Sequence, residues 1–152
     1  MRYVMVLVAT LAFGVGPARA AWEAAADIQP RVEHHIREVG VLIEHFETFV
    51  AGGCPRFSTA AEWDAYADSE IDRMLLLAAH AEQARVEAKR TGDDDVRRAA
   101  KAPRCRLDDA PKILNKLSAC AEDNGATLSP GTVYRRIERD LPGRQSEITL
   151  PR

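Results

Sequence analysis

The sequence has few of the residues from which large cores, membrane spans and enzyme pockets are built. Aromatic residues make up only 6% of the 152 residues, and 25 of the nominally hydrophobic residues are alanines, which add little to a core. Between residues 21 and 152, Val, Ile, Leu and Phe total 27 of 132 residues, a fraction close to that at which compact folding becomes doubtful. The length allows one domain, and so thin a core argues against a large enzyme with a deep pocket.

Motifs typical of common enzyme and cofactor classes are also missing. The chain contains no Gly-x-Ser-x-Gly turn, no phosphate-binding loop, no His-Glu-x-x-His pattern and no Cys-x-x-Cys or Cys-x-x-Cys-His. The favoured interpretation is therefore a protein without catalysis and without a cofactor.

What is present begins with a pattern typical of a secretory signal peptide at Met1–Ala20. Arg2 supplies the positive charge, Tyr3–Val15 the apolar run and Ala18-Arg19-Ala20 the cleavage pattern. The run is shorter than the roughly 20 apolar residues of a membrane span, although an uncleaved anchor is the alternative. We expect a periplasmic or secreted protein that has no stable membrane span after cleavage.

Charge divides the remaining chain into two unlike halves. Residues 21–82 contain 12 acidic and 4 basic side chains, whereas residues 83–152 contain 11 acidic and 15 basic ones. Such a division favours packing of one half on the other, or head-to-tail association of two copies. We expect no nucleic-acid partner, because an exported chain of net negative charge has no interleaved aromatic and basic residues.

The apolar pattern predicts an all-α fold, a small helical hairpin or bundle of two long and two to three short helices, stapled by one disulfide. The first long helix is predicted from Trp22 to Ala51, with Pro30 at its beginning or at a kink, and with Gly52-Gly53 after it. Its apolar residues recur every three or four positions, which defines one buried face. That face comprises Ile28, Val32, Ile36, Val39, Ile43, Phe46 and Val50.

The later helices are predicted from caps and stops. Ser58 or Thr59 can cap a second long helix, and Glu62 has capping-box spacing from Thr59. In an alternative interpretation this helix continues through Gly92. The predicted ranges are Thr59–Arg90, Asp93–Ala102, Asp108 or Asp109 to Gly125, and Ser129–Gly143. We expect one helical domain at residues 21–143 and a flexible tail at residues 144–152.

Three cysteines in an exported chain predict one disulfide and one odd thiol. Cys105 reaches Cys120 only if the chain between them is nearly extended, because Cys120 lies about ten residues, or roughly 15 Å, into its helix. Cys54 follows the first helix. A chain that runs away along the second helix and returns through the short third and the fourth brings Cys120 back toward Cys54. We predict a Cys54–Cys120 disulfide.

Cys105 is then a free thiol between Arg104 and Arg106, whose positive charges favour the thiolate. One hypothesis is a thiol-dependent redox protein that uses Cys105. The alternatives are a solvent-facing cysteine without a role and a bridge between two copies in a homodimer.

Two ligand sets are candidates for metal or haem binding. His34, Glu38 and His45 lie along one face of the first helix, and imidazole and carboxylate at this spacing can share a metal ion. His35 and Met74 lie beside apolar stripes, as haem ligands do in some helical bundles.

Charged rows suggest where a partner binds. Asp64, Asp68 and Asp72 stack at intervals of four residues on the second helix, a pattern typical of a solvated face that can also bind calcium or a basic partner. A basic patch within the chain can instead dock on this row. The patch comprises Arg135, Arg136 and Arg139.

These observations favour a small exported helical protein that acts through its surface. The class includes inhibitors, immunity proteins, chaperones and accessory parts of envelope machines, and the partner is expected to be another exported or envelope protein. The candidate contact residues are Asp64, Asp68, Asp72, Arg104 and Arg106. A metal- or haem-binding bundle is the first alternative, and the Cys105 redox protein is the second.

Overall fold

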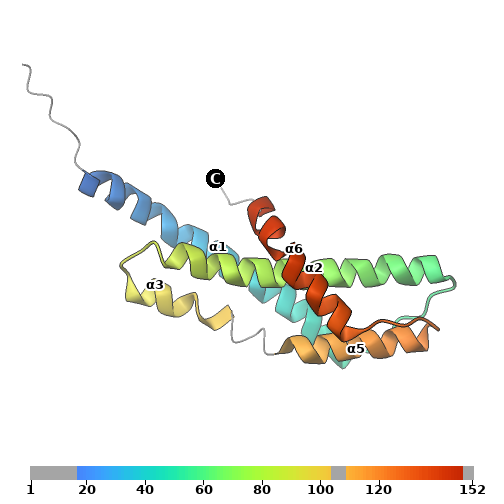
Figure 1. The fold of residues 1–152 in the computed structure, drawn as a ribbon. Helices are drawn as coiled ribbons and strands as arrows, with labels where there is room; N and C mark the ends of the chain where they lie inside the picture. The colour runs from blue at the N-terminus through green and yellow to red at the C-terminus, as the bar shows by residue number, and fades with distance from the viewer. Residues whose placement is uncertain (1–16, 104–108, 149–152) are drawn as a thin grey trace, which may run out of the picture.

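The two longest helices form an antiparallel hairpin. The computed structural model describes residues 17–103 and 109–148, with side chains from Ile28 onward. Helix α1 (Pro17–Ala51) and helix α2 (Ala60–Ala88) run side by side in opposite directions (Figure 1). These described residues contain helices and no strand, so the all-α prediction is confirmed.

Three shorter helices complete the bundle. Helices α3 (Asp94–Ala99) and α5 (Ala110–Asp123) return along the hairpin toward its turn, and α6 (Pro130–Glu147) crosses α2 (Figure 1). The break between α2 and α3 follows the predicted signals, because the Asp93 side chain caps α3 by accepting hydrogen bonds from the backbone N–H groups of Asp95 and Val96. The second helix therefore ends before Gly92 and does not continue through it.

The capping box predicted for the second long helix is present. The Thr59 side chain accepts a hydrogen bond from the Glu62 N–H, and the Glu62 carboxylate accepts one from the Thr59 N–H. These reciprocal bonds satisfy backbone donors that a helix N-terminus leaves unpaired. The predicted start of this helix is confirmed.

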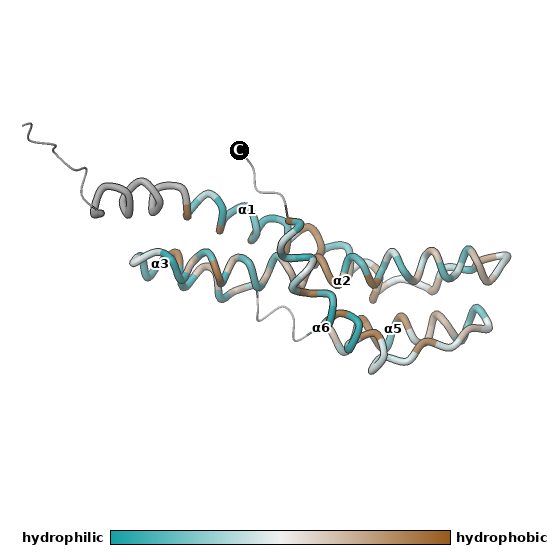
Figure 2. The backbone as a smooth tube through the Cα atoms, turned by 45° about the horizontal axis from the view of Figure 1, so that its top comes forward, coloured by the Kyte–Doolittle hydropathy of each residue, from teal (hydrophilic) through white to brown (hydrophobic). Residues whose placement is uncertain are grey.

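Apolar side chains are buried in two clusters along the hairpin. Hydrophobic and hydrophilic residues alternate along the helices at helical spacing (Figure 2). The larger cluster joins the last turns of α1 and the part of α2 from Trp63 to Ala81 to α5 and to Val133 of α6. The smaller cluster lies at the other end of the hairpin. It consists of Ile28, Val32, Ala84, Ala88 and Ala100.

The buried face of α1 differs from the predicted one at two positions. His35 is fully buried, whereas Ile36 of the predicted face is only partly buried. Phe49 is buried, whereas Val50 of the predicted face is 36% exposed. The helix begins at Pro17, so Pro30 lies inside it and not at its start. The buried face is the one that packs against α2. At these two positions it lies one residue before the face predicted from the apolar pattern.

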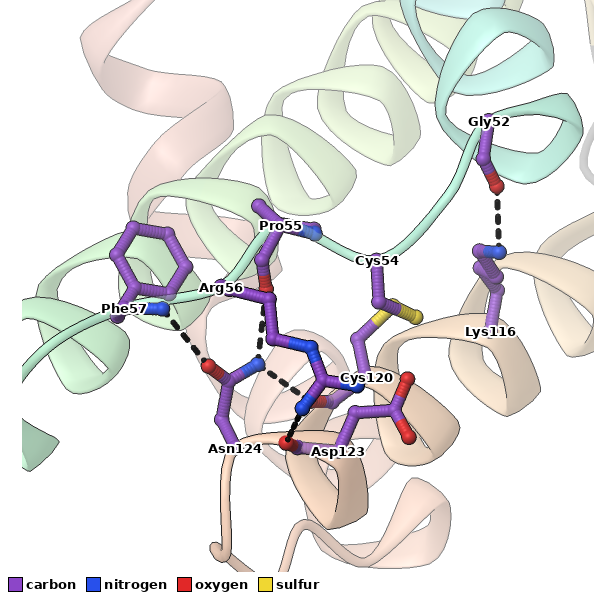
Figure 3. Close-up of a disulfide and its surroundings, with 9 residues drawn as sticks. All are labelled: Gly52, Cys54, Pro55, Arg56, Phe57, Lys116, Cys120, Asp123 and Asn124. Atoms are coloured by element: carbon purple, nitrogen blue, oxygen red, sulfur yellow. Dashed lines mark hydrogen bonds between the residues drawn. A yellow bond between two sulfur atoms is a disulfide. The ribbon is translucent and has the colours of Figure 1, made fainter.

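The predicted disulfide is present and closes the hairpin onto α5. Cys54 and Cys120 are bonded, 66 residues apart in sequence, because α5 returns to the loop that follows α1 (Figure 3). Cys120 is fully buried in the larger cluster. Cys105, the predicted free thiol, lies outside the described residues.

Hydrogen bonds reinforce the same junction. The Asn124 side-chain amide donates to the carbonyl oxygens of Pro55 (2.9 Å) and Cys120 (2.8 Å), and its oxygen accepts from the Phe57 N–H at 3.0 Å (Figure 3). Lys116 Nζ donates to the Gly52 carbonyl oxygen at 2.7 Å. The loop between α1 and α2 is thus attached to the end of α5 by covalent and polar contacts.

The end of α6 differs from the prediction. The helix does not stop at Pro142-Gly143 but continues to Glu147, into the segment 144–152 that was expected to be a flexible tail. Arg144 holds this last turn through ion pairs with Asp72 of α2 and with Glu147. The helix thus continues past a residue that tends to end helices, and the pair with Asp72 attaches its last turn to α2.

The amino-terminal prediction is not tested by the fold. Residues 1–16 lie outside the described part of the chain, and α1 runs across the predicted cleavage point between Ala20 and Ala21. Within the described residues, every helix is too short or too polar to span a membrane.

We expect the disulfide to be a major source of stability. A C54S/C120S variant should lose about 4 kcal/mol of unfolding free energy, because the bond removes the closure entropy of a long loop from the unfolded chain. Urea denaturation of the variant and of the wild type measures this loss. Wild-type protein treated with a reductant should match the variant, and equal stability of the oxidised and reduced forms would contradict the prediction.

Candidate metal centre

Three histidines meet where α1 packs against α2. His34 and His35 are consecutive on α1, and His80 projects from α2, 45 residues after His35. They lie between the two apolar clusters, since on α1 they are flanked by Val32 of the smaller cluster and by Val39 of the larger one. Imidazole rings therefore occupy a layer in which a helical hairpin ordinarily has apolar side chains.

The three rings are close enough to share one ion. One ring nitrogen of each histidine lies within 4.8 Å of one ring nitrogen of the other two. The ring centroids are 5.2 Å apart for His34 and His35, 5.2 Å for His35 and His80, and 5.9 Å for His34 and His80. The shortest contact joins the Nδ1 atoms of His35 and His80 at 2.9 Å. One of these nitrogens carries a proton and donates it to the other.

Burial keeps two of the rings neutral. His35 is fully buried, and this burial, with the neighbouring His80 and His34, lowers its pKa from 6.5 to about 4. His80 is 8% exposed, and burial lowers its pKa as well, although the Glu38 carboxylate opposes that shift. Neutral imidazole is the form that binds a metal ion, so His35 is ready for binding at pH 7 without losing a proton.

One atom of the cluster has no partner in the structure. His35 Nε2 is buried and makes no hydrogen bond, although Nδ1 of the same ring is paired with His80. A buried polar atom left without a partner costs about 1–3 kcal/mol. The histidine cluster therefore leaves one buried nitrogen without the hydrogen bond that buried polar atoms usually make.

A carboxylate and a cavity lie beside the rings. Glu38, one turn after His34, has its Oε1 atom 3.8 Å from His34 Nδ1. His34, Glu38 and His80 face a cavity of about 270 Å³. The opposite wall comes from the end of α6, with Arg144, Glu147 and Ile148. The site is therefore closed on the His35 side and open toward this cavity.

This geometry suits a tetrahedral metal ion. Zn²⁺ takes imidazole nitrogens at about 2.0–2.1 Å, so that two ligands of one ion lie roughly 3.4 Å apart. The separations within the histidine cluster run from 2.9 Å for one pair up to 4.8 Å. These separations lie on both sides of the distance between two ligands of one tetrahedral ion.

The ligand set predicted from the sequence is only partly brought together. Glu38 lies beside His34, but His45 is about three turns further along α1, roughly 16 Å away. There His45 Nε2 lies 2.8 Å from an oxygen of Glu70, which is only 2% exposed and also accepts from Arg73 at 2.7 Å. His45 thus hydrogen-bonds with the buried Glu70 carboxylate and not with the histidine cluster.

The sequence interpretation missed His80. The residue falls at helical spacing from the buried Leu77 and Ala84, so its place on the inner face of α2 could have been found from the pattern. Its proximity to His34 and His35 could not, because it depends on the register of α1 against α2. The histidine that joins His34 and His35 is therefore His80 and not His45.

The two proposed haem ligands take different surroundings. His35 is paired with His80, whereas Met74 is buried in the larger apolar cluster, about 9 Å along α2 from His80. Met74 therefore packs as a core residue here.

The acidic row of α2 is partly occupied by the chain itself. Asp68 pairs with Arg136 at 2.6 Å, Asp72 pairs with Arg144, and Asp64 is exposed. Of the predicted basic patch, Arg136 docks on this row, whereas Arg135 bonds to Thr132 and Arg139 pairs with Asp140 within α6. The other candidate contact residues, Arg104 and Arg106, lie outside the described residues.

Comparison of the chain with models of known protein families, with curated proteins and with solved structures finds no match. The interpretation of the site therefore rests on its geometry.

We expect metal-free protein to lose stability as the pH falls from about 6.5 to about 4. His35 has a pKa of about 4 when folded and 6.5 as the reference value, so in this range the unfolded chain binds more protons and unfolding becomes easier. The loss from this one residue is about 3 kcal/mol. Urea denaturation with a chelator present, at several pH values, measures it.

The comparison variant is His35→Leu, which removes the titrating ring. Its stability should change less over the same pH range than that of the wild type. A wild-type profile parallel to that of the variant would show that His35 is not held neutral.

Proposed function

We propose that this protein binds one divalent transition-metal ion, Zn²⁺ or Cu²⁺, through His34, His35 and His80. The observation that carries the proposal is the convergence of three imidazoles from two helices within 4.8 Å. Imidazole nitrogen is a favoured ligand of both ions. A metal-binding helical bundle is one of the alternatives that the sequence left open.

The burial of His35 and His80 between two apolar clusters favours a metal-binding role over a purely structural one. Two buried imidazoles interrupt a core that is already thin, and one of their nitrogens has no partner. An apolar pair at these positions would bury more surface and leave nothing unsatisfied. A bound ion supplies the favourable interaction that a structural imidazole pair lacks.

Glu38 is the residue that we propose as fourth ligand. Its Oε1 atom lies 3.8 Å from His34 Nδ1, and its side chain is 44% exposed and free to rotate toward the cavity. Three histidines and a carboxylate complete a tetrahedral set. The carboxylate also offsets one of the two positive charges of the ion.

We propose further that the protein works outside the cytoplasm. The Cys54–Cys120 disulfide supports this, because such bonds persist in oxidising compartments. The signal-peptide pattern at Met1–Ala20 points the same way. Binding or carrying a metal ion outside the cytoplasm needs no catalytic step.

Metal titration tests the three histidines. Metal-free wild-type protein without a histidine tag should bind one Zn²⁺ per chain in calorimetry, and the H35Q and H80Q variants should each bind at least about tenfold more weakly, since each lacks a ligand. Zinc at about 100 times its Kd should stabilise the wild type by about 2.7 kcal/mol. Co²⁺ in place of zinc reports the coordination geometry through its visible bands.

The matched control is His45→Gln, because His45 lies on the same helix but contacts Glu70. This variant should keep the affinity of the wild type for zinc. Equal zinc affinity of the wild type and the H35Q/H80Q double variant would refute the proposed site.

Glu38 is tested separately. Glu38→Gln should weaken zinc binding about tenfold, because the amide has no charge and is a poorer ligand. Glu33→Gln is the matched control, since Glu33 is on the same helix and hydrogen-bonds to Gln29. Equal effects of the two substitutions would mean that Glu38 acts only through the overall charge.

A further inference from the structure

We propose that the end of α6 is a gate that controls exchange of the metal ion. The α6 gate consists of residues 143–148. This inference rests on the proposed function and adds to it how the ion enters and leaves. Four features of the structure carry it, namely the position of the cavity, the space around the gate, a weak point in the helix and a single ion pair that holds the gate closed.

The gate lies over the open side of the site. His35 is fully buried, whereas His34 and His80 line the cavity of about 270 Å³. The cavity wall opposite these rings is formed by Arg144, Glu147 and Ile148 of the gate. An ion in this cavity lies between the histidines and the end of α6.

The gate has room to move. A second cavity, of about 430 Å³, lies between α2 and α6 and is also lined by Arg144 and Glu147. The same two side chains thus border open space on two sides, and α6 crosses α2 rather than lying along it (Figure 1). No residue of the α6 gate is buried, so the last turn can swing away without exposing a core side chain.

A weak point separates the gate from the rest of α6. Pro142 has no N–H group, so the helical hydrogen bond to the carbonyl of Glu138 is missing. Gly143, next in the chain, has the lowest helix propensity after proline. The helix before this point is anchored independently by Val133, buried in the larger cluster, and by the Arg136–Asp68 ion pair.

One ion pair holds the gate on α2. Arg144 contacts Asp72 of α2 and also lies 3.4 Å from Glu147 within the gate. A cation that enters the cavity repels Arg144 and attracts the Glu147 carboxylate. Metal passage and the Asp72–Arg144 pair therefore oppose each other, and weakening the pair should speed exchange in both directions.

Three variants separate the gate from the rest of the molecule. Asp72→Asn removes the charge that holds Arg144, whereas P142A/G143A restores a continuous helix and stiffens the weak point; a Cβ at Gly143 meets no atom within 4 Å. Arg136→Gln is the control, because it breaks the other ion pair between α6 and α2 on the near side of Pro142. All three leave the histidines in place.

The first measurement needs no metal. Diethyl pyrocarbonate modifies accessible imidazoles, and the rate at His80, followed by peptide mass spectrometry, reports gate opening. We expect Asp72→Asn to raise this rate about two- to fivefold, P142A/G143A to lower it at least about twofold, and Arg136→Gln to leave it unchanged. Equal rates in all four proteins would overturn the gate.

The second measurement uses zinc-loaded protein. Release into excess chelator, followed by a fluorescent zinc indicator, should be faster in Asp72→Asn and slower in P142A/G143A by the same factors, while the zinc Kd changes less than the rates. If zinc binds but release does not respond to these variants, the gate is wrong and the metal site stands. If zinc does not bind, the proposed function fails, and the His80 modification rates alone decide the gate.

Discussion

The packing of α1 against α2 is the contact on which the rest of the structure depends. Its register sets which side chains of the two helices face each other, and so brings His34 and His35 opposite His80. It also separates the two apolar clusters by the histidine layer. A shift of one residue in this register would turn His35 away from His80, because consecutive helical residues point about 100° apart.

The disulfide junction maintains this packing at one end. Cys54–Cys120 and the Asn124 hydrogen bonds attach the loop after α1 to α5, which in turn packs on the larger cluster. A chain with few large apolar side chains gains little from burial, so constraints on the unfolded state contribute a large share of its stability. Because the disulfide junction supplies this stability, the fold tolerates two buried imidazoles that do not stabilise it themselves.

The helix α6 combines a fixed part and a loosely held part. Val133 is buried in the larger cluster, whereas beyond Pro142 the contact with α2 is carried by Arg144 and its ion pair with Asp72. An ion pair that is only partly buried contributes little to stability. The physical difference between a packed segment and a charge-held one is what allows a single helix to support the fold and to cover the metal site.

The sequence by itself determined much of the local structure. Thr59 and Glu62 defined the start of α2 and Asp93 the start of α3, because caps are local properties. The disulfide followed from the expected return of the chain along the hairpin, which the helix lengths and breaks predicted. Pro142 misled the prediction, since α6 continues past it to Glu147, where Arg144 contacts Asp72 of α2. Only the tertiary structure decided that His80 joins His34 and His35 while His45 turns to Glu70. Which residues meet across two helices depends on register and rotation, and no spacing along one helix contains that information.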